Sequence, residues 1–210
     1  MNHASSLFSK TAGWFERAKA ALGDNLPRSR GCSHCCVGLF PVTILDRQEI
    51  QRGLHSIPSE QRRAIEERAA RQARMIEASA PQVALHPVID HWPDRDTDAL
   101  VERFRELPCP ALEADGSCSL YEFRPLACRS MGIPVESEGI VQGACAIQTS
   151  VPLIRLSPSF RHEEDRLAGE EAEELAQLRV RQRMPGEELL LPYAFLPDVL
   201  EEPMKAVTCR

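Results

Sequence analysis

The N-terminal part of the chain places apolar residues at helical spacing. Between Ser5 and Leu22 they recur every three or four positions, and this pattern predicts an amphipathic helix. A transit peptide or a membrane-surface helix would share the pattern, but Glu16 and the modest basic content disfavour both. The positions that form the stripe are Leu7, Thr11, Trp14, Phe15, Ala18 and Leu22.

Two further helices are predicted in the next fifty residues. Asp46 and Glu49 have the spacing of a capping box, which predicts a short helix through about Leu54, ended by Gly53 and Pro58. Ser59 is placed to cap a longer helix that extends to about Ser79, and the charges on its outer side are those of a solvated face. Its apolar stripe consists of Ile65, Ala69, Ala73 and Ile76.

The middle of the chain is less regular. Prolines break the stretch from Pro81 to Asp96, which is predicted to be a surface connection, and Thr97 is predicted to cap a helix to about Leu107. From Cys109 to Gly143 the pattern predicts a loop-rich zone. It includes a tight turn at Asp115-Gly116 and small strands flanked by Gly132 and Gly139.

The C-terminal part returns to helical periodicity. Ser159 is predicted to begin an acidic helix that Pro185-Gly186 ends. Its inward residues are predicted to be Ala168, Ala172, Leu175 and Leu178, and the following tail is predicted to pack through Leu189, Leu191, Phe195 and Leu196.

These elements predict a mainly α fold with a small irregular, partly β cysteine-rich zone, an α+β arrangement in one metal-stapled domain. We expect residues 1–30 to form the N-terminal amphipathic helix and a linker, and residues 31–148 the cysteine-cluster metal-binding domain. Residues 149–210 are expected to supply a C-terminal helix and a tail that pack on that domain.

Composition and charge narrow the function. The chain has 210 residues, 43% of them apolar and 27% charged, as in an average globular protein. A formal net charge of -6 offers no basic field for a phosphate backbone, so nucleic acid is not expected as a partner. No apolar run is long enough for a membrane span, and no secretory signal is visible, which predicts a cytoplasmic protein.

Eight cysteines are therefore expected to serve something other than disulfides. Cys32-x-x-Cys35 has the spacing of a metal knuckle, and Cys36 follows directly. The complete predicted ligand set is Cys32, Cys35, Cys36, Cys109, Cys118, Cys128 and Cys145. These seven thiols exceed the four that a structural zinc ion takes, which favours an iron–sulfur cluster with spare thiols or more than one ion.

Charged residues and one histidine lie near the cysteines in sequence. Arg124 and Arg129 bracket Cys128 and could offset thiolate charge, which either metal would leave in excess. Cys209 is isolated and is predicted to be a bystander. His34 is predicted to be an exposed loop residue rather than a nitrogen ligand.

The cysteine motifs resemble the YkgJ-type cysteine-cluster family. The resemblance is carried by Cys32-x-x-Cys35-Cys36, by Cys109-Pro-x-Leu112, and by Cys118-x-x-Tyr121-x-x-Arg124-Pro125-x-x-Cys128-Arg129, with Cys145 as the late cysteine. It covers about residues 31 to 148. The resemblance implies a zinc- or iron-chelating domain, often labelled an iron–sulfur protein, with no general activity attached.

The leading hypothesis is a metal-binding protein that holds an iron–sulfur cluster, or alternatively zinc, for electron transfer, metal handling or structure. One alternative is a cluster-dependent oxidoreductase or protein-modifying enzyme, and another is a zinc-stabilised interaction adaptor. Neither a dinucleotide-binding loop nor a phosphate-binding loop occurs, and catalytic residues are unassigned. A protein partner is left open.

Overall fold

The computed structural model describes residues 3–22, 33–85, 87–131, 135–137, 140–142, 157–182 and 186–197. In chain order the elements are α1 (His3–Leu22), η2 (His34–Cys36), β1 (Pro41–Thr43), α2 (Ile44–Ser56), α3 (Ser59–Ser79), α4 (Gln82–Leu85), α5 (Asp94–Arg103), η3 (Tyr121–Phe123), α6 (Leu126–Ser130), β2 (Val135–Ser137), β3 (Ile140–Gln142), α7 (Pro158–Gln182), β4 (Glu188–Leu190) and α8 (Leu191–Ala194). The predicted mainly helical fold is confirmed.

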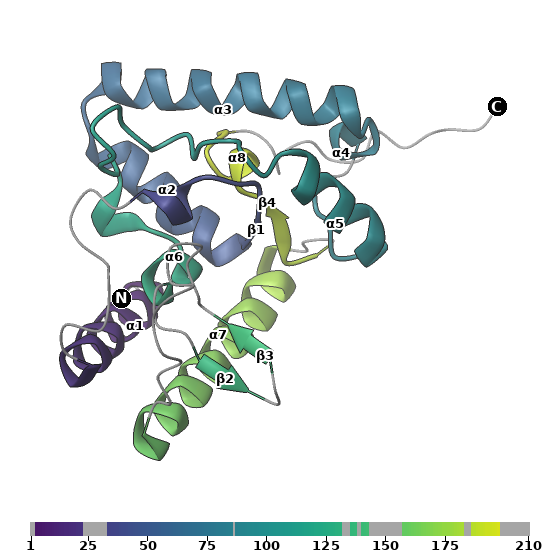
Figure 1. Cartoon of the computed structure of the whole chain (residues 1–210). Helices are drawn as coiled ribbons and strands as arrows, with labels where there is room; N and C mark the ends of the chain where they lie inside the picture. The colour runs from purple at the N-terminus through teal and green to yellow at the C-terminus, as the bar shows by residue number, and fades with distance from the viewer. Residues whose placement is uncertain are drawn as a thin grey trace.

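The helices surround a small central strand pair. In Figure 1, α3 runs along one side of the molecule while α1 and α7 lie together on the opposite side, with α2, β1 and β4 between them. β1 and β4 pair antiparallel, with Val42 opposite Leu189, although they are far apart in sequence. This pairing joins the beginning of the cysteine-rich part to the C-terminal part.

A single hydrophobic core connects the elements. It contains residues from α1, α2, α3, α7 and α8, so all three predicted segments contribute to it. The indole of Trp14 in α1 is fully buried, and its Nε1 donates to the carbonyl of Phe160 in α7 at 3.0 Å. The boundaries between the three segments stay predictions.

The predicted stripe of α1 is confirmed where its side chains are described. Leu7, Trp14, Phe15 and Ala18 are buried, and Thr11 is nearly so, with its hydroxyl donating to the carbonyl of Leu7. None of the helices among the described residues combines the length and the apolar character that crossing a membrane requires.

The start of α2 differs from the prediction. Thr43 is the N-cap: its hydroxyl accepts from the Asp46 amide, and the Asp46 carboxylate accepts from the Thr43 amide. The capping box therefore has Asp46 at the N3 position, whereas the prediction placed Asp46 at the N-cap and Glu49 at N3. The side chain of Glu49 is buried in the interior instead. Gly53 lies within the helix, which continues to Ser56, so the prediction that Gly53 ends it was wrong.

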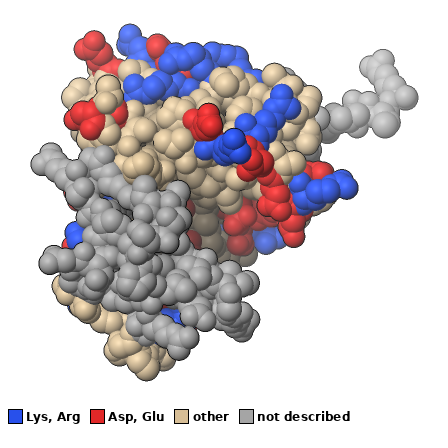
Figure 2. All heavy atoms as spheres, in the orientation of Figure 1, with Lys and Arg blue, Asp and Glu red and all other residues tan. Residues whose placement is uncertain are grey.

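α3 has the predicted length and buries the predicted stripe, while Pro58 rather than Ser59 occupies its N-cap position. Its outer face is charged and exposed. Lys and Arg side chains gather along this side of the molecule in Figure 2, and the exposed arginines of α3 are Arg63, Arg71 and Arg74.

The stretch from Pro81 to Asp96 is not merely a surface connection. It contains α4, and Val83, Val88 and Ile89 are buried. The reason is a long-range contact, because the Ile89 amide donates to the carbonyl of Glu188, the first residue of β4, at 3.0 Å. The next helix, α5, begins at Asp94 after an N-cap at Pro93 and ends at Arg103, so Thr97 does not cap it.

The predicted turn and small strands of the cysteine-rich zone are confirmed. Gly116 has a φ of +80°, and β2 and β3 pair antiparallel. In α7 the inward stripe differs from the prediction. Leu167, Leu175 and Leu178 are buried, whereas Ala168 and Ala172 are exposed. The larger leucines gain more from burial than alanine does, and they set the inward face.

Candidate metal centre

Five of the predicted ligands lie in the described residues: Cys35, Cys36, Cys109, Cys118 and Cys128. All five are partly buried thiols rather than disulfides. Cys32, Cys145 and the predicted bystander Cys209 lie outside the described residues. His34 is exposed, as predicted.

Backbone pairing brings the first two cysteine segments together. The Cys109 amide donates to the carbonyl of Cys36 at 2.7 Å, and the Gly38 amide donates to the carbonyl of Leu107 at 2.8 Å. Val37 and Pro108 form an antiparallel pair between these bonds. Residues separated by about seventy positions in the sequence are thereby neighbours.

A tight turn brings Cys118 back beside Cys109. Leu112 pairs antiparallel with Cys118, and the Leu112 amide donates to the carbonyl of Cys109 at 3.0 Å. Gly116 supplies the left-handed backbone conformation that this turn needs and that an L side chain rarely adopts.

Side chains of α3 hold the segment that precedes Cys118. Gln72 donates from Nε2 to the carbonyl of Pro108 at 2.8 Å, and Arg68 donates from Nε to the carbonyl of Pro110 at 2.7 Å. Because Arg68 and Gln72 are four positions apart, they lie on one face of α3 and bind the two carbonyls on either side of Cys109.

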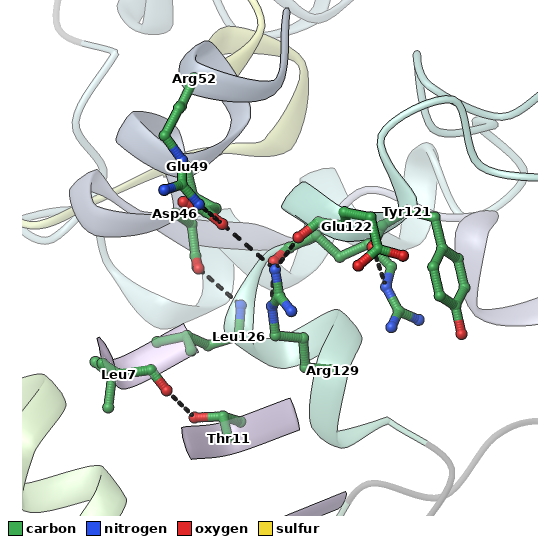
Figure 3. A network of polar contacts seen from close by, with 10 residues as sticks. Leu7, Thr11, Asp46, Glu49, Arg52, Tyr121, Glu122, Leu126 and Arg129 are labelled. Carbon is green, nitrogen blue, oxygen red and sulfur yellow. Dashed lines mark hydrogen bonds and ion pairs between the residues drawn. The ribbon is translucent and has the colours of Figure 1, made fainter. Parts of the chain in front are cut away.

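Cys128 lies on the short helix α6, which α2 holds in place (Figure 3). The Leu126 amide, at the first residue of α6, donates to Asp46 Oδ1 at 2.8 Å. Arg129, the residue after Cys128, forms an ion pair with Glu49 at 3.4 Å, and both side chains are buried. Thus Asp46 and Glu49, on consecutive turns of α2, bind either side of Cys128.

The environment opposes ionisation of isolated thiols. Burial raises the pKa of Cys109 from 9.0 to about 12 and raises those of Cys118 and Cys128 as well. For Cys36 the largest cause is a hydrogen bond with Cys35, followed by burial, and both raise its pKa. Thiolates form readily in such surroundings only when a cation replaces the protons.

The charges of the thiols also act on one another. The charges of Cys109, Cys35 and Cys118 each raise the pKa of Cys128, after burial and together with Asp46. Cys109 and Cys128 act on Cys36 in the same way. Several thiolates in this region would repel one another unless a metal neutralised them.

The donor set fits a thiophilic metal in its chemistry, because the described candidates are all sulfur. Within the described ranges, however, no three side chains of Cys, His, Asp or Glu come close enough together to hold a metal ion. Three segments supply the described thiols, and the predicted ligands Cys32 and Cys145 lie outside the described ranges.

A comparison with protein families supports this chemistry. Residues 28–146 match the family model CxxCxxCC, described as "Putative zinc- or iron-chelating domain". The chain belongs to this family. The predicted resemblance to a cysteine-cluster family is therefore confirmed, and α1, α7, β4 and α8 lie outside the matched residues of this CxxCxxCC protein.

No curated protein and no solved structure matched the chain. The family description, a zinc- or iron-chelating domain, gives the coarse function that the comparisons support.

Sequence reasoning missed the residues that hold the cysteines from behind. The sequence indicates Asp46 and Glu49 only as a helix-start signal, and it does not distinguish Arg68 and Gln72 from the other polar residues of their helix. One signal was available in the sequence, since Arg129 directly follows the predicted ligand Cys128. If such an arginine is buried, it needs an acidic partner that is buried as well. Which acid it would be depends on the tertiary fold.

Proposed function

We propose that the protein binds a metal centre through cysteine thiolates, with an iron–sulfur cluster as the favoured occupant and zinc as the alternative. The observation that carries the proposal is the backbone pairing of Cys36 with Cys109, because it brings together thiols from two distant segments without a disulfide. The proposed ligands come from Cys35, Cys36, Cys109, Cys118 and Cys128, together with Cys32 and Cys145.

The kind of donor supports the favoured occupant. Iron–sulfur clusters are held mainly by thiolates, whereas structural zinc sites take four ligands in all and often include histidine. The only histidine inside a cysteine group, His34, is exposed. A cluster would supply one-electron transfer when bound, and a zinc ion would supply structural cross-linking.

The surroundings support a buried charge of this kind. Four thiolates around a dipositive centre leave about two negative charges, and Arg129, the residue after Cys128, contributes a buried guanidinium that is ion-paired with Glu49. In this proposal the cysteines bind the metal as thiolates. Partial burial of Cys109 and Cys128 limits the access of water to them.

The test is anaerobic purification, followed by the visible spectrum and analysis of iron, zinc and acid-labile sulfide in one sample. A coloured protein with iron and sulfide would support the cluster, and a colourless protein with zinc would support the alternative. A protein with neither metal after reconstitution with each would overturn the proposal.

A matched pair of variants locates the site. Cys118→Ala is expected to lose bound metal, whereas Cys209→Ala, outside the proposed ligand set, is expected to retain it. Equal metal content in the wild type and Cys118→Ala would remove Cys118 from the proposed ligands.

A further inference from the structure

Cys128 is carried by a helix too short to hold its own orientation. α6 has five residues, and isolated helices shorter than about 12 residues are marginal in water. The direction of the Cys128 side chain therefore depends on what binds α6 from outside. The bonds of Asp46 and Glu49 in Figure 3 are such contacts.

Arg129 makes several polar side-chain contacts between α6 and its neighbours. Its Nη2 donates to the carbonyl of Glu122 at 2.5 Å and lies 3.4 Å from Glu49 Oε1, and its Nε donates to the carbonyl of Arg124 at 2.9 Å. The same Glu49 oxygen accepts from Arg52 at 2.6 Å. One guanidinium therefore connects α2, η3 and α6.

The ring of Phe8 in α1 lies on another side of this guanidinium, 5.4 Å from its carbon. The side chains of Arg129 and Glu49 are only 7% and 4% exposed. A guanidinium with contacts on this many sides has little freedom to rotate, and the backbone of the adjacent residue, Cys128, shares that restriction.

The ion pair is better explained by geometry than by stability. Replacing a buried ion pair with well-packed apolar residues is often neutral for folding, because desolvation of both charges offsets their attraction. What apolar residues do not reproduce is the direction of the guanidinium bonds. Substitution of residues that hold a metal ligand in its orientation commonly lowers metal affinity by about 10- to 100-fold.

We propose that Glu49 and Arg129 are positioning residues that fix Cys128 for metal binding. The inference rests on the proposed function. It gives α2 the role of orienting a ligand of the metal site without supplying a ligand itself.

The test is a titration of the metal-free full-length protein with cobalt(II), in competition with a chelator. Sulfur-to-cobalt absorption reports how many thiolates bind. Glu49→Gln is expected to weaken apparent cobalt affinity by about 10- to 100-fold and to reduce this absorption per bound ion. Arg129→Lys, which keeps the charge but not the planar fork, is expected to retain part of the wild-type cobalt affinity.

Glu66→Gln is the matched control, because Glu66 makes a more exposed ion pair with Arg62 on α3. It is expected to leave both the affinity and the absorption unchanged. The thermal midpoint of each metal-free variant separates folding from metal binding. A folded Glu49→Gln protein with wild-type affinity and wild-type absorption would overturn the inference.

If Glu49→Gln alone does not fold, the double variant Glu49→Met with Arg129→Met replaces it, since it leaves neither member of this pair as a charge without its partner. Wild-type cobalt binding by that double variant would equally overturn the inference. A wild-type protein that binds no cobalt would instead count against the proposed function, so the two failures are distinguishable.

Discussion

The two cysteine-bearing parts of the site are attached to the rest of the molecule in different ways. Among the bonds between described residues, residues 33–38 are joined to 107–109 by backbone bonds at Cys36 and Gly38. Residues 108–130 also receive side-chain bonds from two helices, α3 at the carbonyls of 108 and 110 and α2 at 126 and 129.

The difference indicates which part of the site is fixed before a metal binds. Side-chain bonds from two long helices hold Cys109 and Cys128 in place without any metal. Residues 33–38 are joined to 107–109 through a short backbone pairing, and we expect this part to adjust to the ion. At the proposed site, a preformed half and an adaptable half would limit the chain entropy lost when metal binds.

The largest test of this comparison is to remove the buried guanidinium. Arg129→Met eliminates its bonds to Glu49, Glu122 and Arg124 and leaves the Glu49 carboxylate buried beside Arg52 alone. We expect the free energy of unfolding to fall by about 3 kcal/mol, measured by chemical denaturation of the metal-free protein. Arg105→Met, which removes an exposed ion pair with Glu102, is the control and is expected to cost less than about 1 kcal/mol.

A loss of less than about 1 kcal/mol in Arg129→Met would mean that α6 does not depend on this arginine. The fixed half would then have to be held by Asp46 and the backbone.

A smaller effect is expected from moving α2 away from η3. A Cβ at Gly53 would lie 2.7 Å from Cβ of Phe123 and 2.8 Å from its Cγ, so Gly53→Ala must displace η3. We expect a loss of about 1 to 2 kcal/mol by the same measurement, because overpacking exceeds the gain in helix propensity.

Gly169→Ala in α7 is the matched control, since nothing lies within 4 Å of a Cβ there. It is expected to stabilise the protein by about 0.5 to 1 kcal/mol through helix propensity. The same gain in both variants would show that the contact between α2 and Phe123 tolerates movement.

Glu171 tests whether the charge of a carboxylate on α7 is unfavourable beside Asp46 on α2. Burial, followed by the charges of Asp46 and Glu188, raises the pKa of Glu171 from 4.5 to about 7. The folded state therefore favours the protonated carboxyl. Its contribution to stability is full below about pH 4.5 and is lost as pH rises through 7.

Glu171→Gln, which stays neutral, is expected to stabilise the protein at pH 8 by about 1 kcal/mol and to have little effect at pH 4.5. Thermal unfolding of both proteins at the two pH values checks this. A variant less stable than the wild type at pH 8 would show that the Glu171 charge is favourable where it lies.

The smallest effect is expected at His34. Because its side chain is exposed at the adaptable half of the site, His34→Ala is expected to change neither metal content nor the thermal midpoint. A loss of bound metal would make His34 a ligand. The residues around Cys35 would then belong to the fixed part of the site.

Local patterns were sufficient for α1, for the stripe of α3 and for the turn at Gly116, because each depends on residues close together in sequence. The helix start at Thr43 was misplaced by three positions, since both Asp46 and Glu49 satisfy the spacing of a cap. The reciprocal bonds between Thr43 and Asp46, together with the burial of Glu49 against Arg129, distinguish them.

The cysteine spacing predicted the candidate ligands but not what supports them. Pairing of β1 with β4 and contact of Gln72 with the carbonyl of Pro108 depend on packing between distant segments. Neither strand has more than three residues, so neither carries a periodic signal strong enough to be recognised.

The pairing of β1 with β4 also bears on the order in which the protein is made. β1 leaves the ribosome well before β4, and at ordinary rates of synthesis the interval is on the order of ten seconds. Before β4 is made, every cysteine from 32 to 145 has been synthesised, whereas the strand that completes the sheet has not. The proposed ligands are therefore all present in the chain before β1 can pair with β4.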